Sequence, residues 1–173
     1  MATIKESLAG TATLTCTLAL AVANYTSRES TVAVNTVNLY LDANLMIKIQ
    51  MGGTAATGDS WILLSSSVDG SLFSTPATGA DAAITIPQID KLGGEQTGQF
   101  HAGTNLVVLG KMNMNGTATT ATATCNFGSI AQAFGGNLMP QWGAVVVNAT
   151  GTAFGTTTAN NLIFYDGVFA TSV

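Results

Sequence analysis

Alternation of apolar and polar residues with a period of two is the feature that most constrains how this chain can fold. In segment 39–51, LYLDANLMIKIQM, an apolar residue occupies every second position from Leu45 to Met51, and Lys48 and Gln50 lie between the last of them. Successive side chains of a β-strand point to opposite faces, so this pattern predicts a strand with one buried face. Helical spacing is nearly absent from the chain. The sequence therefore predicts an all-β protein.

Further strands follow from the same pattern and from the turn residues between the segments. They are predicted at 60–68, 82–86, 105–114, 117–125, 142–148 and 161–171. Asp166-Gly167 lies inside the last of them and predicts a bulge, because apolar residues continue on both sides. Between Phe127 and Pro140, the stretch GSIAQAFGGNLMP predicts at most one helical turn, which ends at Gly135-Gly136.

The pair Asn115-Gly116 predicts a tight hairpin of type I′. This hairpin would place 105–114 directly opposite the uncharged stretch TATTATATC, residues 117–125. Thr is β-branched and suits a pleated surface, whereas Ala leaves room for a bulkier neighbour. We therefore expect Thr on one face of this strand and Ala on the other, covered by a second sheet or by another subunit.

Seven or more strands with one short helix predict an antiparallel β-sandwich, and a jelly roll is the version expected for this many strands. A length of 173 residues fits one domain. We assign residues 14–173 to this single domain. Residues 1–13 precede the first apolar alternation, contain Gly10, and are expected to form an extended arm rather than a core strand.

Charged residues make up 8% of the chain, against about 25% in an average soluble domain. Soluble monomers usually rely on surface charge, so we expect other protein subunits to cover much of this surface. The net charge is −4, and the five basic residues are spread along the chain, which argues against nucleic-acid binding. The apolar run 14–23 is interrupted and far shorter than about 20 residues, so we expect neither membrane insertion nor a signal peptide.

Residues that could support catalysis or bind a metal are few. The single histidine, His101, lies in a glycine-rich loop, and the chain has no G-x-S-x-G motif. Cys16 and Cys125 stand alone, so zinc is not expected; they are interpreted as two small buried thiols, and whether they pair is left open. The aspartates lack the spacing of a calcium loop. We expect no enzyme activity, no metal and no cofactor.

Carbohydrate binding is an alternative, because sugar sites use exposed aromatic rings beside amide groups. The candidate aromatic residues are Tyr25, Trp61, Phe73, Phe100 and Trp142. The two tryptophans begin strands beside aliphatic residues and are expected in the core.

Three groups of residues are candidates for contacts between subunits. Arg28-Glu29 forms the one local charge cluster, which is either a surface ion pair or an anchor across an interface. The other candidates are apolar residues of the arm and threonines of the Thr/Ala-rich stretch. The complete set is Ile4, Leu8, Arg28, Glu29, Thr117, Thr119 and Thr122.

Several segments resemble small structural proteins encoded by tailed bacteriophages and prophages. They are SRESTVAVNTVNLYLDANLMIKI, SWILLSSSVDGS, FGGNLMPQWGAVVVNATGTAF and NLIFYDGVFAT, and together they extend from about Arg28 to Phe169. The likeness lies in the order and composition of these segments. It provides no site motif from which functional residues could be transferred.

This resemblance implies a β-sandwich virion component without enzymatic activity, most like a capsid decoration or cement protein. The implied partners are the major capsid protein and neighbouring copies of the chain, on the capsid exterior after synthesis in the cytoplasm of the bacterial host. Two alternatives stay open. One is a phage tail or head-fibre component that binds a host surface glycan, and the other is a carbohydrate-binding β-sandwich outside any virus.

Overall fold

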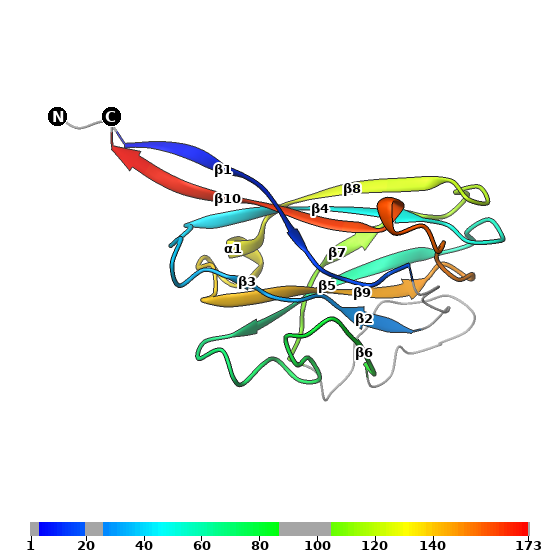
Figure 1. The fold of residues 1–173 in the computed structure, drawn as a ribbon, viewed down its shortest axis with the longest axis horizontal. Helices are drawn as coiled ribbons and strands as arrows, with labels where there is room; N and C mark the ends of the chain where they lie inside the picture. Colours follow the sequence, from blue (N-terminus) through cyan, green and yellow to red (C-terminus); the bar gives the residue numbers. More distant parts are fainter. Residues whose placement is uncertain (1–3, 20–25, 87–104, 173) are drawn as a thin grey trace.

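Residues 4–19, 26–86 and 105–172 are described by a computed structural model, in which two antiparallel sheets pack face to face (Figure 1). The four-stranded sheet has the spatial order β1 (Ile4–Leu14), β10 (Leu162–Ser172), β4 (Asp42–Gln50) and β8 (Thr122–Ser129). The six-stranded sheet has the order β6 (Ala82–Ile84), β2 (Ser27–Glu29), β9 (Gln141–Ala149), β5 (Asp59–Ser67) and β7 (Val107–Met112), and β3 (Ala33–Val34) also pairs with β9. The predicted all-β antiparallel sandwich is confirmed.

The main core lies between the two sheets, where the predicted alternation of β4 is observed. Leu45, Ile47 and Ile49 point inward and are at most 1% exposed. Asn44, which precedes Leu45 in the strand, is exposed on the outer face. From the opposite sheet, Trp142 of β9 packs edge-on against Tyr165 of β10, with the ring centroids 5.3 Å apart. The core expectation for Trp142 is confirmed, because this side chain is fully buried.

Strand β9 is buried on both of its faces, which explains its nearly continuous apolar run. Ala144 and Val146 belong to the core between the sheets. Val145 and Val147 point the other way, into a second apolar cluster on the outer side of the six-stranded sheet. Trp61 is only partly buried and packs against this second cluster. A strand covered on both sides loses the period-two pattern that half-buried strands show.

The short helix α1 (Ile130–Ala133) lies within the stretch where the sequence predicts one helical turn, and it ends just before Gly135-Gly136. The Ser129 hydroxyl accepts a hydrogen bond from the Gln132 N–H and caps its first turn. Gly135 and Gly136 follow with φ of 88° and 109°, a conformation that glycine adopts readily and that ends the helix. A 3₁₀ turn, η1 (Thr158–Asn160), precedes β10. Within the described ranges, neither helical segment is long or apolar enough to cross a membrane.

The predicted hairpin of 105–125 is wrong. A turn does form at Asn115-Gly116, where the Thr117 N–H donates to the Met114 carbonyl at 2.9 Å. Gly116 has φ of 81°, but Asn115 does not have the positive φ that a type I′ turn requires. The turn connects the two sheets instead: β7 pairs with β5, and β8 pairs with β4. Strand β8 accordingly starts at Thr122 rather than at 117.

The expected distribution of Thr and Ala holds along β8. Ala123 and Cys125 point toward the core, and Thr122 and Thr124 are exposed on the outer face. The covering layer on the Ala side is therefore the second sheet of the same chain.

The first residues of the chain were expected to form an extended arm rather than a core strand. From Ile4 onward they form β1, which pairs with β10 from Ile4–Ser172 to Leu14–Ile163. The bulge expected at Asp166-Gly167 lies in the partner strand, because the register shifts between Leu8 and Thr11 of β1 while β10 continues without interruption against β4. Sequence reasoning missed β1 because its first half lies beyond the core and needs no alternating apolar residues.

Substituting Gly116 tests the turn between the sheets. The variant Gly116→Val forces a β-branched residue to φ near 81°, and we expect it to lower the free energy of unfolding by about 1–3 kcal/mol. Urea denaturation measures the change. Gly128→Val is the matched control, because an added Cβ meets no atom within 4 Å at either position and Gly128 lacks the positive φ. Equal unfolding midpoints for the two variants would contradict the assigned turn.

Candidate assembly surface

A two-stranded ribbon projects from one end of the four-stranded sheet (Figure 1). It consists of residues 4–8 of β1 and 168–172 of β10, and we call it the terminal ribbon. β10 pairs with β4 only as far as Val168, so beyond that residue the ribbon has no third strand in the described part of the chain. Two paired strands alone are only marginally stable in water, so a contact that covers the ribbon would stabilise it.

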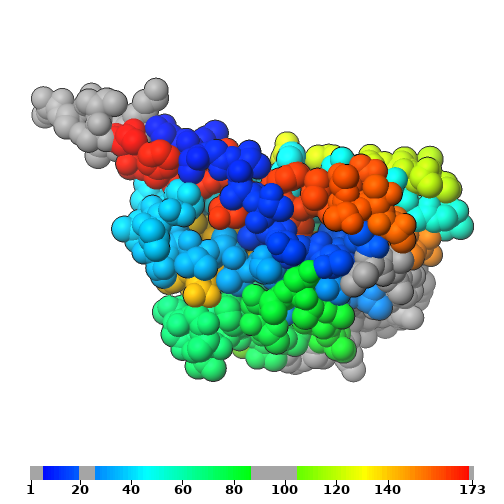
Figure 2. All heavy atoms as spheres, viewed as in Figure 1, coloured from blue at the N-terminus to red at the C-terminus, as the bar shows by residue number. Residues whose placement is uncertain are grey.

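A groove of about 400 Å³ lies where the terminal ribbon leaves the sandwich. Its lining residues are Glu6, Ser7, Leu8, Leu41, Asp42, Asn44 and Val168. Leu8 and Leu41 are 60% and 56% exposed, and the Leu41 N–H donates to the Val168 carbonyl at 2.7 Å, which ties segment 35–41 to the base of the ribbon. Figure 2 shows the ribbon extending past the body of the molecule above this segment. We call this groove the ribbon groove.

Segment 35–41 adds further exposed apolar side chains beside the ribbon groove. Val37 and Leu39 are both mostly exposed. Sequence reasoning began a strand at residue 39, but Leu39 has φ of 51°, and the Asn35 side chain binds both the N–H and the carbonyl of Tyr40. This local turn delays β4 until Asp42, so the chain crosses the end of the sandwich before it enters the sheet. The sequence signal for this exposed segment is an apolar stretch that ends in a turn. The alternating strand pattern, which predicts a strand from residue 39, obscured that turn.

Of the residues predicted at an interface, Ile4 and Leu8 both lie in the terminal ribbon, and Leu8 lines the ribbon groove. Thr117 and Thr119 lie in the connection before β8, and Thr122 is the first residue of β8. Thr122 pairs with Gln50, at the end of β4 opposite to the ribbon groove. The structure therefore separates the predicted residues into two distant surfaces and does not gather them into one.

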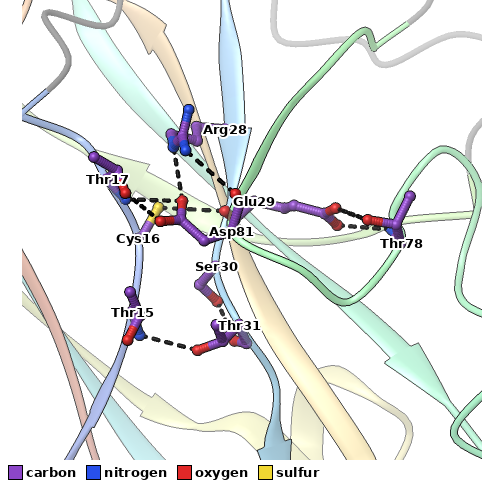
Figure 3. A network of polar contacts seen from close by, with 9 residues as sticks. All are labelled: Thr15, Cys16, Thr17, Arg28, Glu29, Ser30, Thr31, Thr78 and Asp81. Atoms are coloured by element: carbon purple, nitrogen blue, oxygen red, sulfur yellow. Dashed lines mark hydrogen bonds and ion pairs between the residues drawn. The ribbon is translucent and has the colours of Figure 1, made fainter.

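Arg28 and Glu29 do not pair with each other, because consecutive residues of a strand point to opposite sides (Figure 3). The Arg28 Nε donates to Asp81 at 2.7 Å, and both side chains of this ion pair are less than one-fifth exposed. The Asp81 carboxylate also accepts hydrogen bonds from the Thr17 N–H and hydroxyl. The pair therefore joins β2 to the segment after β1 and to the loop before β6.

Glu29 is fully buried on the other side of β2, and its carboxylate binds the loop before β6. It accepts hydrogen bonds from the Thr78 N–H and hydroxyl and from the Gly79 N–H. Cys16, which is also buried, donates a long hydrogen bond to the Glu29 carbonyl at 3.6 Å. From the sequence, Arg28 and Glu29 were interpreted either as a surface ion pair or as an anchor across an interface. In the structure, both side chains bind partners within the same chain.

The two cysteines are the described candidates for nucleophilic chemistry. Burial raises the pKa of the Cys16 thiol far above its usual range, so it stays protonated and is a poor nucleophile. Cys16 and Cys125 are both free thiols. In the described ranges, no three His, Cys, Asp or Glu side chains gather into a possible metal-binding group. His101 lies outside the described residues.

The aromatic residues considered for sugar binding do not form a common platform in the described structure. Phe73 packs over Gly79, where an added Cβ would lie 2.5 Å from its ring. Trp142 is buried in the core. Tyr25 and Phe100 lie outside the described residues. A different aromatic residue, Phe164, lies on the outer face of the four-stranded sheet in a shallow pocket of about 200 Å³.

Comparison with known proteins gives no relative. No protein-family model, no curated protein and no solved structure matches this chain.

Acid pH should weaken the contacts of Asp81. Burial alone would raise the pKa of this carboxyl, but hydrogen bonds from Thr17 and Arg28 outweigh it and hold the pKa below the usual value. The contribution to stability is therefore present above the unfolded pKa of about 3.9 and is lost as the pH falls through the lower folded value. We expect Asp81→Asn to be about 1–3 kcal/mol less stable than the parent at pH 7, and this gap to shrink below pH 4.

Thermal and urea unfolding from pH 7 to pH 2.5 measures this gap. Glu6→Gln is the control: its exposed side chain lies in the ribbon groove, and the substitution should leave stability unchanged. A gap of constant size across the whole pH range would show that Asp81 does not stabilise the fold through its charge.

Proposed function

We propose that this protein is a non-enzymatic structural protein of a virion, which decorates and stabilises the outer surface of a phage capsid. In this proposal its partners are the major capsid protein and neighbouring copies of itself. The observation on which the proposal mainly rests is the terminal ribbon with its groove: an exposed, partly apolar projection on a domain that has few charges. The resemblance of its segments to phage structural proteins supports the same conclusion.

We further infer that the sandwich is a jelly roll. Without the short strands β3 and β6, the first strand pairs with the last, β2 with β9, β4 with β8, and β5 with β7. Such nested pairing, divided between two packed sheets, is what results when one long hairpin is rolled up. Jelly rolls of this kind occur in viral capsid proteins and in lectins. The inferred topology is therefore compatible with the proposed role but is not specific to it.

The ribbon groove supplies the proposed attachment site. Its apolar residues, Leu8, Leu41 and Val168, lie beside Glu6 and Asp42. A partner would bury the leucines and offer a donor or a basic group to the exposed Glu6. Burying one exposed leucine is worth about 1.5–3 kcal/mol, so the two leucines together would contribute roughly 3–6 kcal/mol to the attachment of each copy. A protein that binds only the assembled capsid also stabilises it by mass action.

Replacing both leucines tests the attachment site. The double variant Leu8→Ser/Leu41→Ser keeps β1 paired with β10, whereas deleting residues 2–12 would remove most of that strand. Because both leucines are exposed, the variant should melt like the parent. Its co-sedimentation with capsids that lack the protein should weaken at least tenfold.

Leu72→Ser is the matched control, since Leu72 is 77% exposed but lies in the loop between β5 and β6. It should bind capsids like the parent. Equal binding by the double variant would exclude the ribbon groove as the attachment site. The number of copies in purified particles separates head from tail: hundreds fit a capsid lattice, and a few to a few tens fit a tail or fibre.

A second candidate function is glycan binding, as a tail or head-fibre component or outside any virus, and the pocket at Phe164 favours it. The apolar side chains of Phe164 and Met46 line this pocket together with the polar residues Asn44, Asn126 and Asp166. Sugars combine apolar ring faces with hydroxyl groups, which such a surface can match.

A glycan-array screen of the parent protein and of Phe164→Ala tests this candidate. Binding by the parent that Phe164→Ala abolishes would support it. If the parent protein binds no glycan, the hypothesis of glycan recognition at this pocket is excluded. Leu72→Ser again serves as the control, because its position is distant in sequence from the pocket and does not line it.

A further inference from the structure

In the described part of the chain, β1 and β8 lie at the edges of one sheet and β6 and β7 at the edges of the other, and these four strands differ in how they are protected against pairing with another chain. Natural proteins protect edges with short strands, charges and bulges. β6 has only three residues. β7 contains the exposed Lys111 and a register shift against β5. β1 contains the exposed Glu6 and the bulge after Leu8.

β8 differs from the other three edges. It has eight residues, TATCNFGS, without a charge or a proline. Its register shifts only at its end, between Phe127 and Ser129. Residues 122–127 therefore form a regular, uncharged edge, which is the type of edge that accepts a further strand.

The hydrogen-bonding pattern shows which backbone groups β8 presents at this edge. Gln50 directs its N–H to the Asn161 side chain and its carbonyl to the Gly155 N–H, both on the side of β10. Thr122, opposite Gln50, is therefore in a non-hydrogen-bonded pair. Such pairs alternate along an antiparallel ladder, so Thr122, Thr124 and Asn126 direct their N–H and carbonyl groups away from β4. These groups have no backbone partner in the described part of the chain.

The same edge matches itself. If a second copy adds its β8 antiparallel with Thr124 opposite Thr124, then Thr122 of each copy faces Asn126 of the other. Each of these residue pairs can exchange two backbone hydrogen bonds. The facing side chains are small and neutral, so no like charges oppose each other, and threonine pairs across strands are favourable. A two-fold arrangement of this kind is the commonest symmetry of soluble homo-oligomers.

An uncharged groove lies beside this edge. A groove of about 340 Å³ runs between β7, β8 and α1. It is lined by Val108, Leu109, Phe127, Gly128, Ser129, Gln132 and Ala133, and none of these described residues is charged. A second copy joined through β8 would approach this groove and shield its apolar residues from water.

We propose that β8 is the self-association edge of this protein, where a second copy adds its own β8 antiparallel about a two-fold axis at Thr124 and joins the two four-stranded sheets. This inference rests on the geometry of β8 and not on the proposed attachment to a capsid. Either one can fail without the other. If both hold, β8 supplies the contact between neighbouring copies and the terminal ribbon supplies the contact with the capsid.

Charge variants at the axis test the proposal. By sedimentation velocity across a concentration series, we expect the parent to form dimers and Thr124→Lys and Thr124→Glu each to raise the dimer dissociation constant at least tenfold, because like charges then face each other. An equimolar mixture of the two variants should form dimers again. Thr124 is exposed, so both variants should melt like the parent. Thr13→Lys, an exposed position on β1, is the control and should dimerise like the parent.

A cross-linking experiment gives a second measurement that detects weak association. In a Cys125→Ser background, Thr124→Cys should form a disulfide-linked dimer on mild oxidation, since residues opposite each other in a ladder lie within disulfide range. Thr11→Cys, exposed on β1, should not. A parent protein that stays monomeric and does not cross-link at residue 124 would overturn the proposal, as would a dimer that Thr124→Lys leaves intact.

Discussion

The position of β10 between β1 and β4 is the constraint on which the rest of this structure depends. β10 gives β1 its partner along the length of that strand and pairs with β4 over residues 162–168. The buried Asn161 fixes where β10 begins, since its amide donates to the Gly155 and Thr157 carbonyls and its side-chain oxygen accepts from the Gln50 N–H. Gly167 leaves space for the Tyr40 ring, which a Cβ would approach to 2.5 Å. The terminal ribbon and its groove exist because β10 continues past β4.

The fold class and the strands with a buried face were predictable from the sequence. β4, β5, β9 and β10 each contain an apolar pattern strong enough to locate them within a few residues. The short helix was predictable too, because Gly135-Gly136 can only end it. These features depend on local preferences and on burial of one face, and both are written in neighbouring residues.

The failures share one physical cause, which is that pairing partners lie far apart in the sequence. Asn115-Gly116 predicts a turn correctly, but a turn does not determine whether the next strand joins the same sheet or crosses to the other one. Arg28 and Glu29 are adjacent in the sequence, yet the pleat of β2 sends them to opposite sides, toward Asp81 and Thr78. Of the residues that line the ribbon groove, sequence reasoning predicted only Leu8 at an interface. The other half of this groove, Leu41, depends on the turn at Leu39 that moves segment 35–41 out of the sheet.

The scarcity of charge has a structural counterpart in how the few charged groups are used. Arg28 pairs with Asp81 inside the fold, where both side chains are less than one-fifth exposed, whereas the Lys111–Asp59 pair lies at the surface with Lys111 exposed. The exposed apolar residues and the uncharged edge of β8 are the surfaces that partners would cover. The proposed role in capsid assembly would account for both the composition and the geometry, and its most direct test is electron cryomicroscopy of phage particles that contain the protein. The account predicts the sandwich on the outer capsid surface with the terminal ribbon buried against a neighbouring subunit. A ribbon that points into solvent, or a chain that is absent from the head, would contradict it.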